Sequence, residues 1–246
     1  MSKEEENMRN SSIESGHFSG IENEAQNRTL ALDRRTFLEA GSVALAGLTV
    51  VTQSANAESI SGGEEIWSFE TSDMVDTSPT VVDGTVFVGS RDNTVYALDA
   101  SDGSEVWSFE TSDTVDTSPT VVDGTVFVGS RDNTVYALDA SDGSEVWSFE
   151  TGDIVGSSPT VVDGTVFVGS YDNTVYALDA SDGSEVWSFE TGDVVFSSPT
   201  VVDGTVFVGN YDNTVYALDT SDGSEVWSFE TGDSVLSSPT VVDGTV

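Results

Sequence analysis

Short apolar runs separated by turn residues fill the chain from about residue 60 onward. In one representative stretch the runs are EVWSFET at 105–111, SPTVV at 118–122, TVFVG at 125–129 and TVYALD at 134–139. Runs of this length, rich in Val, Phe, Tyr and Trp, predict β-strands. No later segment has the 3.6-residue apolar spacing of a helix, so we expect strands alone in this part of the chain.

The breaks between the runs have turn sequences. Asp123-Gly124 fits a two-residue hairpin, because Gly adopts a positive φ freely and Asp tolerates one. Residues 130–133 and 140–144 are longer polar loops. Four strands joined in this way predict an antiparallel meander.

A period of 40 residues organises this pattern. The unit occupies residues 61–100, 101–140, 141–180 and 181–220, with a partial copy at 221–246. Within one strand Val126 and Val128 oppose Phe127, so both faces of the sheet are apolar. Sheets of this kind bury both faces by stacking around an axis, and we expect an all-β fold, a β-propeller of four-stranded antiparallel blades. A β-sandwich is the alternative, but it gives no reason for identical repeats.

A motif that spans the junction between successive repeats resembles the tryptophan-docking motif, A-x-D-x-x-T-G-x-x-x-W, of the PQQ-like (pyrroloquinoline-quinone) repeat β-propellers. Residues 97–107 read ALDASDGSEVW. The resemblance implies that each Trp packs between its own blade and the next. The docking residues are then Trp67, Trp107, Trp147, Trp187 and Trp227, with Ala97, Ala137, Ala177, Ala217, Gly103, Gly143, Gly183 and Gly223. Asp102 and its equivalents depart from the motif, since they stand where the family usually has Thr.

The charge balance is strongly acidic, with seven Lys and Arg against 44 Asp and Glu. From Ser59 onward only Arg91 and Arg131 oppose 35 acidic residues, a net charge of −33. Such a surface repels nucleic acid and anionic membranes. At molar salt the Debye length falls to about 3 Å, which screens the self-repulsion. The composition therefore resembles that of haloarchaeal and other extremely halophilic proteins; a calcium-loaded acidic protein is the alternative.

The N-terminal part divides into two segments. Residues 1–32 are polar, acidic and aperiodic, and we expect them to be disordered. Residues 33–57 resemble a twin-arginine export signal, with Arg34 and Arg35 ahead of an apolar run that is too short to span a bilayer core of about 30 Å.

Ala55 and Ala57 form a small-x-small cleavage site, which predicts a mature chain that begins at Glu58. We expect this chain to be exported to the cell surface or the medium, without insertion of the mature chain into a membrane. Retention of the uncleaved signal as a tether is the alternative.

Residues 58–246 are expected to form the propeller domain. The sequence stops at Val246, within the second strand of the fifth repeat. We expect a fragment of a longer gene product with seven or eight blades. The alternative is four complete blades with a split fifth, to which residues 65–71 would add the fourth strand beside a missing third one.

The few positions that vary between repeats predict a binding surface. They fall in the two kinds of loop that leave a meander on the same side, and binding residues are often carried on such loops. The candidate face consists of Asp76, Arg91, Asp116, Arg131, Gly156, Tyr171, Phe196, Tyr211 and Leu236. Repeats with Asp at the first variable position carry Arg at the second, whereas repeats with Gly or Phe carry Tyr. Duplication of the repeats in pairs would produce the same correlation.

No residue is singled out as catalytic, metal-binding or cofactor-binding. The only histidine, His17, precedes the signal, so the mature chain lacks a Ser-His-Asp triad, and the sequence has no Cys. The acidic loop that begins at Asp99 lacks the ligand spacing of an EF-hand.

The sequence therefore predicts an exported, non-enzymatic scaffold without a cofactor. It resembles the PQQ-like propeller of the bacterial outer-membrane assembly machinery, and its expected partner is an unidentified protein or polymer. The alternative is a quinoprotein dehydrogenase whose PQQ site lies in missing sequence.

Overall fold

The apolar runs form short strands in four separate sheets. The computed structural model describes residues 65–242 and 244–246, and these contain sixteen strands and no helix. None of these residues forms a helix that could cross a membrane. The predicted disordered segment and export signal lie outside the described residues.

Each sheet has four strands in chain order. The first sheet holds β1 (Thr80–Val82), β2 (Thr85–Gly89), β3 (Thr94–Asp99) and β4 (Glu105–Glu110). The second holds β5 (Thr120–Val122), β6 (Thr125–Gly129), β7 (Thr134–Asp139) and β8 (Glu145–Glu150). The third holds β9 (Thr160–Val162), β10 (Thr165–Gly169), β11 (Thr174–Asp179) and β12 (Glu185–Glu190). The fourth holds β13 (Thr200–Val202), β14 (Thr205–Gly209), β15 (Thr214–Asp219) and β16 (Glu225–Glu230).

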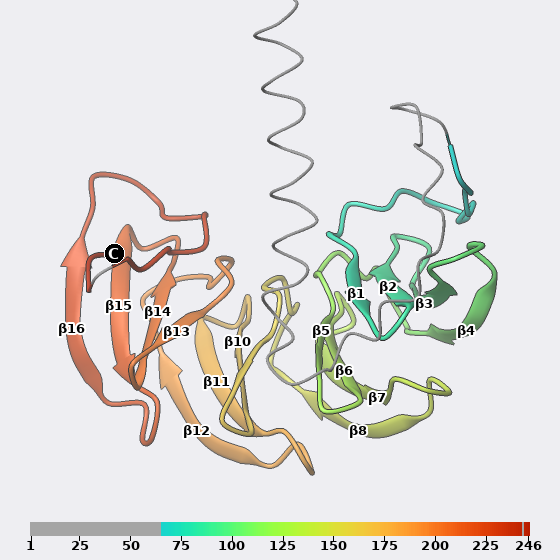
Figure 1. Cartoon of the computed structure of the whole chain (residues 1–246). Helices are drawn as coiled ribbons and strands as arrows, with labels where there is room; N and C mark the ends of the chain where they lie inside the picture. Colours follow the sequence, from blue (N-terminus) through green and yellow to red (C-terminus); the bar gives the residue numbers. More distant parts are fainter. Residues whose placement is uncertain (1–64, 243) are drawn as a thin grey trace, which may run out of the picture. The chain divides into compact units, whose positions relative to one another are not determined.

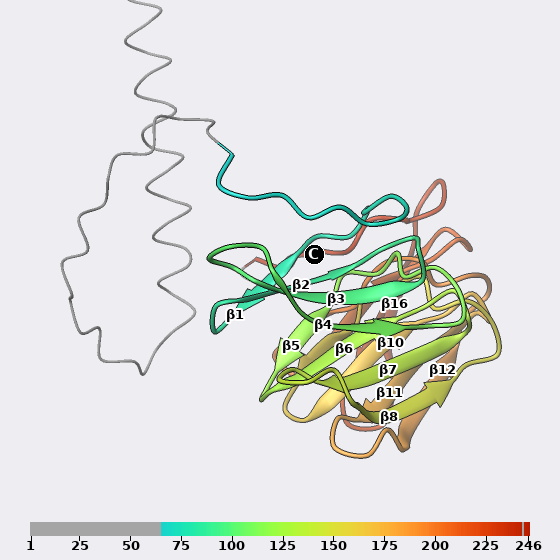
Figure 2. The same ribbon diagram turned by 90° about the vertical axis from the view of Figure 1, so that its right-hand side faces the viewer.

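The sheets are the blades of a β-propeller, as the repeats predict. All strand pairs are antiparallel, and β1 contacts β5, β5 contacts β9 and β9 contacts β13. The first strands therefore lie innermost and the fourth strands outermost (Figure 1). In the turned view of Figure 2, β5 to β8 follow one another edge to edge. The expected fold class is confirmed.

Local turn chemistry sets the register within each blade. Asp123 and Gly124 have φ values of 49° and 77°, so the predicted two-residue hairpin is confirmed and Val122 pairs with Thr125. The first strand is shorter than expected, beginning at Thr120 and not at residue 118. Pro119 has no N–H to donate to a ladder, and its carbonyl instead accepts a hydrogen bond from Thr80 Oγ1 (2.6 Å).

A hydrogen-bonded ladder joins the inner strands of neighbouring blades. Ser118 N donates to Ser158 Oγ (2.9 Å), and Thr120 Oγ1 donates to the Pro159 carbonyl (2.6 Å). The same two bonds recur at every seam between blades. Because the ladder uses the invariant Ser-Pro-Thr sequence, each blade is fixed to the next at the same position.

The apolar core lies between blades, and a Trp occupies each seam. Trp107 is only 7% exposed, and its Nε1 donates to the Ala140 carbonyl (3.0 Å). Gly143 has φ +73°, and a Cβ there would lie 2.7 Å from the Trp107 ring. Glycine is therefore required by both the backbone and the packing. Phe87 packs beside the indole, with ring centroids 5.8 Å apart.

Trp67, Trp147 and Trp187 dock in the same way, whereas Trp227 differs. Ala137 lies opposite Trp147 across β7 and β8 and is fully buried. The indole Nε1 donates a hydrogen bond to the carbonyl 33 residues onward in Trp67, Trp107, Trp147 and Trp187. Trp227 contacts Phe207 and is 39% exposed.

The segments before β1 and after β16 lie beside complete blades. Trp67 packs against Gly103 of the first blade, where a Cβ would lie 2.5 Å from the indole. At the other end, Val242 and Thr245 form an isolated antiparallel bridge. Within the described residues, the four sheets contain no strand from residues 65–71 or 240–246.

Candidate functional site

Backbone hydrogen bonds hold the loops of the candidate face in place. Tyr171 N donates to the Ile154 carbonyl (2.8 Å), which fixes the loop after β10 to the loop before β9. Val195 N donates to the Ser170 carbonyl (3.1 Å), which fixes the third blade to the loop that enters the fourth. Equivalent bonds recur in the other blades, so the variable side chains project from a rigid framework.

Two Asp–Arg pairs occupy the face over the first two blades. Arg91 Nη2 lies 2.5 Å from Asp76 Oδ2, and Arg131 Nε lies 2.6 Å from Asp116 Oδ2. The Asp116 hydrogen bond raises the pKa of Arg131. These are the residues whose types vary together in the sequence. Since both guanidinium groups are partly exposed, each pair contributes only about 0–1 kcal/mol to stability.

Aromatic side chains replace the ion pairs over the third and fourth blades. The Tyr171 ring lies over Gly156, where a Cβ would be 2.6 Å from Tyr171 Cε1. Tyr171 also contacts Phe196 across the seam, with ring centroids 6.2 Å apart and planes at 60°. Such an edge-to-face contact is a favourable aromatic geometry. The Gly–Tyr combination in the third repeat therefore has a packing reason.

The aromatic residues remain open to solvent. Phe196 is 37%, Tyr211 40% and Leu236 43% exposed, while Tyr171 is partly buried. Burial raises the pKa of Tyr171, the nearby Arg131 lowers it, and Tyr211 raises it. We name Tyr171, Phe196 and Tyr211 the aromatic half of the candidate face.

An Asp–Tyr contact supports the loops beneath this surface. In the third blade Asp172 Oδ2 accepts hydrogen bonds from Gly152 N (2.7 Å) and Tyr176 Oη (2.7 Å). Burial raises the pKa of Tyr176, and the bond to Asp172 raises it further, to about 12. The equivalent phenols Tyr136 and Tyr216 also have a pKa of about 12.

These phenols predict a loss of stability in strong alkali. Tyr136, Tyr176 and Tyr216 have pKa values of about 12 in the folded chain, whereas an ordinary tyrosine has a pKa of 10.0. The folded state therefore favours the neutral phenol, and this contribution is complete below pH 10 and lost as the pH rises to about 12. Urea unfolding measured across this range should show a falling midpoint. The triple Phe variant should show a shallower fall, and an equal slope in both proteins would contradict the assignment.

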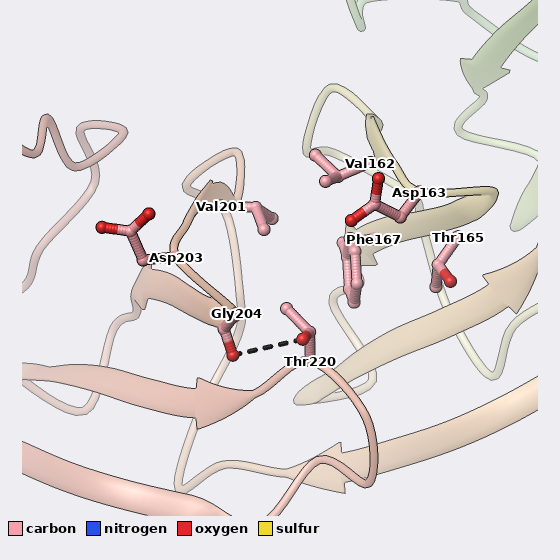
Figure 3. A pocket seen from close by; sticks show the side chains of 8 residues that line it. All are labelled: Val162, Asp163, Thr165, Phe167, Val201, Asp203, Gly204 and Thr220. Carbon is pink, nitrogen blue, oxygen red and sulfur yellow. Dashed lines mark hydrogen bonds between the residues drawn. The ribbon is translucent and has the colours of Figure 1, made fainter.

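The opposite side of the blades carries cavities between hairpin turns. A cavity of about 330 Å³ lies between the turns of the third and fourth blades. Asp203 lies on one side of it, and Asp163 and Phe167 lie on the other (Figure 3). Thr220 Oγ1 donates to the Gly204 carbonyl (3.1 Å) in its wall. Cavities of about 470 and 450 Å³ with equivalent linings occur at the other two seams. They are features of the repeat.

Sequence reasoning missed one group that positions the variable loops. Val115, Val155 and Val195 are fully buried although they lie in the loops that vary most. A Cβ on Gly129 would collide with the Val155 side chain, so Val and Gly pack tightly across each seam. The signal was present in the sequence, since this Val is unchanged between two variable positions.

The blades and their seams together define a β-propeller of the PQQ-like repeat type. The chain belongs to the family described as outer membrane protein assembly factor BamB, whose sequence profile matches residues 51–155 and 150–246. No curated protein matches the chain in sequence.

Solved structures share the fold at low sequence identity. BamB from Moraxella catarrhalis is 23% identical with a TM-score of 0.62, and the match covers 69% of this chain and 56% of that one. The computationally designed Ika8 protein is 20% identical, with a TM-score of 0.60 and coverages of 65% and 50%. The quinohemoprotein alcohol dehydrogenase ADHIIG from Pseudomonas putida HK5 is 24% identical, with a TM-score of 0.60 and coverages of 69% and 36%. The chain therefore spans about half or less of these structures.

The dehydrogenase similarity raises the question of a quinone and its metal. Within residues 65–242 and 244–246, no three His, Cys, Asp or Glu side chains form a group that could hold a metal ion. The two arginines of this region, Arg91 and Arg131, are both paired with aspartates. The described residues thus do not fit a quinone–metal centre, and the likeness to the dehydrogenase is one of fold.

Proposed function

We propose that the protein is an exported, non-enzymatic binding module that presents its variable loop face to a protein or polymer partner. The observation that carries the proposal is the location of the variable residues. Tyr171, Phe196 and Tyr211 converge on one side of a framework whose other positions are nearly identical in every blade. Exposed aromatic anchors on rigid loops are typical of binding surfaces.

The framework supports this role because it holds the loops without using the variable side chains. The ladder that includes Ser118 and Thr120, the docked Trp residues and the Asp–Tyr contacts are the same at each seam. A substitution on the face, such as Gly in place of Asp, changes the surface and leaves these contacts in place. The scaffold can therefore vary its binding residues without losing these contacts.

The proposed setting is the cell surface or the medium, at high salt. The predicted twin-arginine signal with Arg34 and Arg35 supports export, and the net charge of −33 from Ser59 onward supports folding where salt screens the acids. Membership of a family described as an outer membrane protein assembly factor supports a protein partner over other polymers.

A photo-crosslinking experiment tests the proposal. A photoreactive phenylalanine analogue at Phe196 should yield specific crosslinked products in the cells that make the protein. The same analogue at Asp163, on a hairpin turn of the opposite side, serves as the control and should yield none. The captured partner should then bind the purified protein about tenfold more weakly after Phe196→Ala, since central aromatic anchors typically contribute this much or more.

Two results would contradict the proposal. Equal crosslinking from both positions would show that the partner does not bind preferentially to the variable face. Unchanged affinity of the purified partner for the Phe196→Ala protein would remove the aromatic half as a binding surface.

A further inference from the structure

The charges around the aromatic half are unbalanced. Asp153 is exposed in the loop between β8 and β9, and its charge raises the pKa of Tyr171. Asp193 is exposed in the loop that carries Phe196. Asp172 and Asp212 lie in the same loops as Tyr171 and Tyr211.

Within the described residues, the cations that could balance these acids are engaged elsewhere. Arg91 pairs with Asp76, and Arg131 pairs with Asp116. Together the two pairs neutralise the half of the face that lies over the first and second blades. The loops of the aromatic half, over the third and fourth blades, carry acids and no Arg or Lys. The nearby cation, Arg131 beside Tyr171, is already bonded to Asp116, so a partner that supplies positive charge is favoured there.

The exposed rings favour the same kind of partner. The faces of Tyr and Phe rings attract Lys and especially Arg side chains, and this attraction adds to that of the nearby carboxylates. Leu236, 43% exposed, adds an aliphatic surface beyond the fourth blade. Because successive repeats supply the rings and the Leu, the surface suits an extended segment better than a single small ion.

We propose that the aromatic half binds a protein segment in which Arg or Lys residues alternate with apolar ones. This inference rests on the proposed function, because it names the chemistry of the partner for the same face. The cationic side chains lie against Tyr171, Phe196 and Tyr211 and pair with Asp153 and Asp193. The apolar residues of the segment contact Leu236 and the ring edges.

The repeats themselves supply the matched variants for a test. The double change Gly156→Asp with Tyr171→Arg installs the Asp–Arg pair found in the first and second blades, so the fold already accommodates it. It places a guanidinium where the proposal requires a ring. The reverse change, Asp116→Gly with Arg131→Tyr, extends the aromatic half by one blade. Asp163→Asn, on the opposite side, is the surface control.

The experiment measures the binding of labelled peptides to the full-length protein by fluorescence anisotropy. Three peptides share a Leu-containing sequence and differ in carrying Arg, Gln or Glu at the alternate positions. The Arg peptide should bind most tightly, and its affinity should fall as salt rises. The Gly156→Asp, Tyr171→Arg protein should bind the Arg peptide about tenfold more weakly than the parent protein does. The reverse variant should bind it more tightly, and Asp163→Asn should leave the affinity unchanged. Each variant should unfold at the same urea midpoint as the parent protein, which establishes that its effect is on binding. Phe196→Ala serves as a second variant that removes a ring from the same surface.

The outcomes separate the two proposals. If the Gln or Glu peptide binds as tightly as the Arg peptide and the Tyr171→Arg change still weakens it, the face is a binding surface but the cationic partner is wrong. If neither the double change nor Phe196→Ala alters the binding of any peptide or of the captured partner, both the inference and the proposed function are overturned.

Discussion

Trp147→Ala should lower the free energy of unfolding by about 3–5 kcal/mol, the usual result of removing a large buried aromatic side chain. Trp147 is 7% exposed, packs on Gly183, contacts Phe127 and donates a hydrogen bond to the Ala180 carbonyl (2.9 Å). Its removal leaves a cavity between two blades and an unpaired carbonyl. Urea unfolding followed by circular dichroism measures the change.

Trp227→Ala is the matched control. The repeat around Trp227 is nearly the same, but this side chain is 39% exposed. Its removal should cost about 1 kcal/mol, since less apolar surface leaves water. Equal losses in the two variants would mean that seam packing is not what stabilises the array.

Gly143→Ala should also destabilise the protein strongly, by about 2–5 kcal/mol. Gly143 has φ +73°, a conformation that costs an L-residue about 1–2 kcal/mol. The new Cβ would in addition lie 2.7 Å from Trp107, and overpacking of this kind typically costs about 1–3 kcal/mol. Calorimetry or urea unfolding measures the total.

Gly124→Ala separates the cost of the backbone conformation from the cost of overpacking. Gly124 has φ +77°, but nothing lies within 4 Å of a Cβ placed there. The free energy of unfolding of this variant should therefore fall by only about 1–2 kcal/mol, the cost of the backbone conformation. If Gly143→Ala were no worse than Gly124→Ala, the indole would have room to move and the seam would be looser than its geometry indicates.

Much of the fold could be predicted because its rules are local. TVFVG and TVYALD alternate with period two, and Asp123-Gly124 requires a tight hairpin, so strands and turns follow from neighbouring residues. The first strand was predicted two residues too long, because the contact of Pro119 with the preceding blade is not visible within one repeat.

The candidate site was less accessible to such reasoning. The sequence showed that Asp and Arg vary together, but only the structure brings Arg131 within 2.6 Å of Asp116. The contact between Tyr171 and Phe196 joins two repeats, and nothing in the repeat frame requires it. The buried Val155 shows the opposite case, in which an unchanged residue between variable ones was available to read and was missed.

The sequence by itself determined the blade, its turns and the position of a Trp near the start of every repeat. These follow from side-chain alternation and turn chemistry over spans of a few residues. Only the tertiary structure decided which indoles are covered, as Trp147 and Trp227 show, and which loop residues meet across a seam. The reason is that such contacts depend on how one blade packs against the next. Because the 40-residue repeats are nearly identical, the sequence of a repeat does not indicate which neighbours its blade contacts.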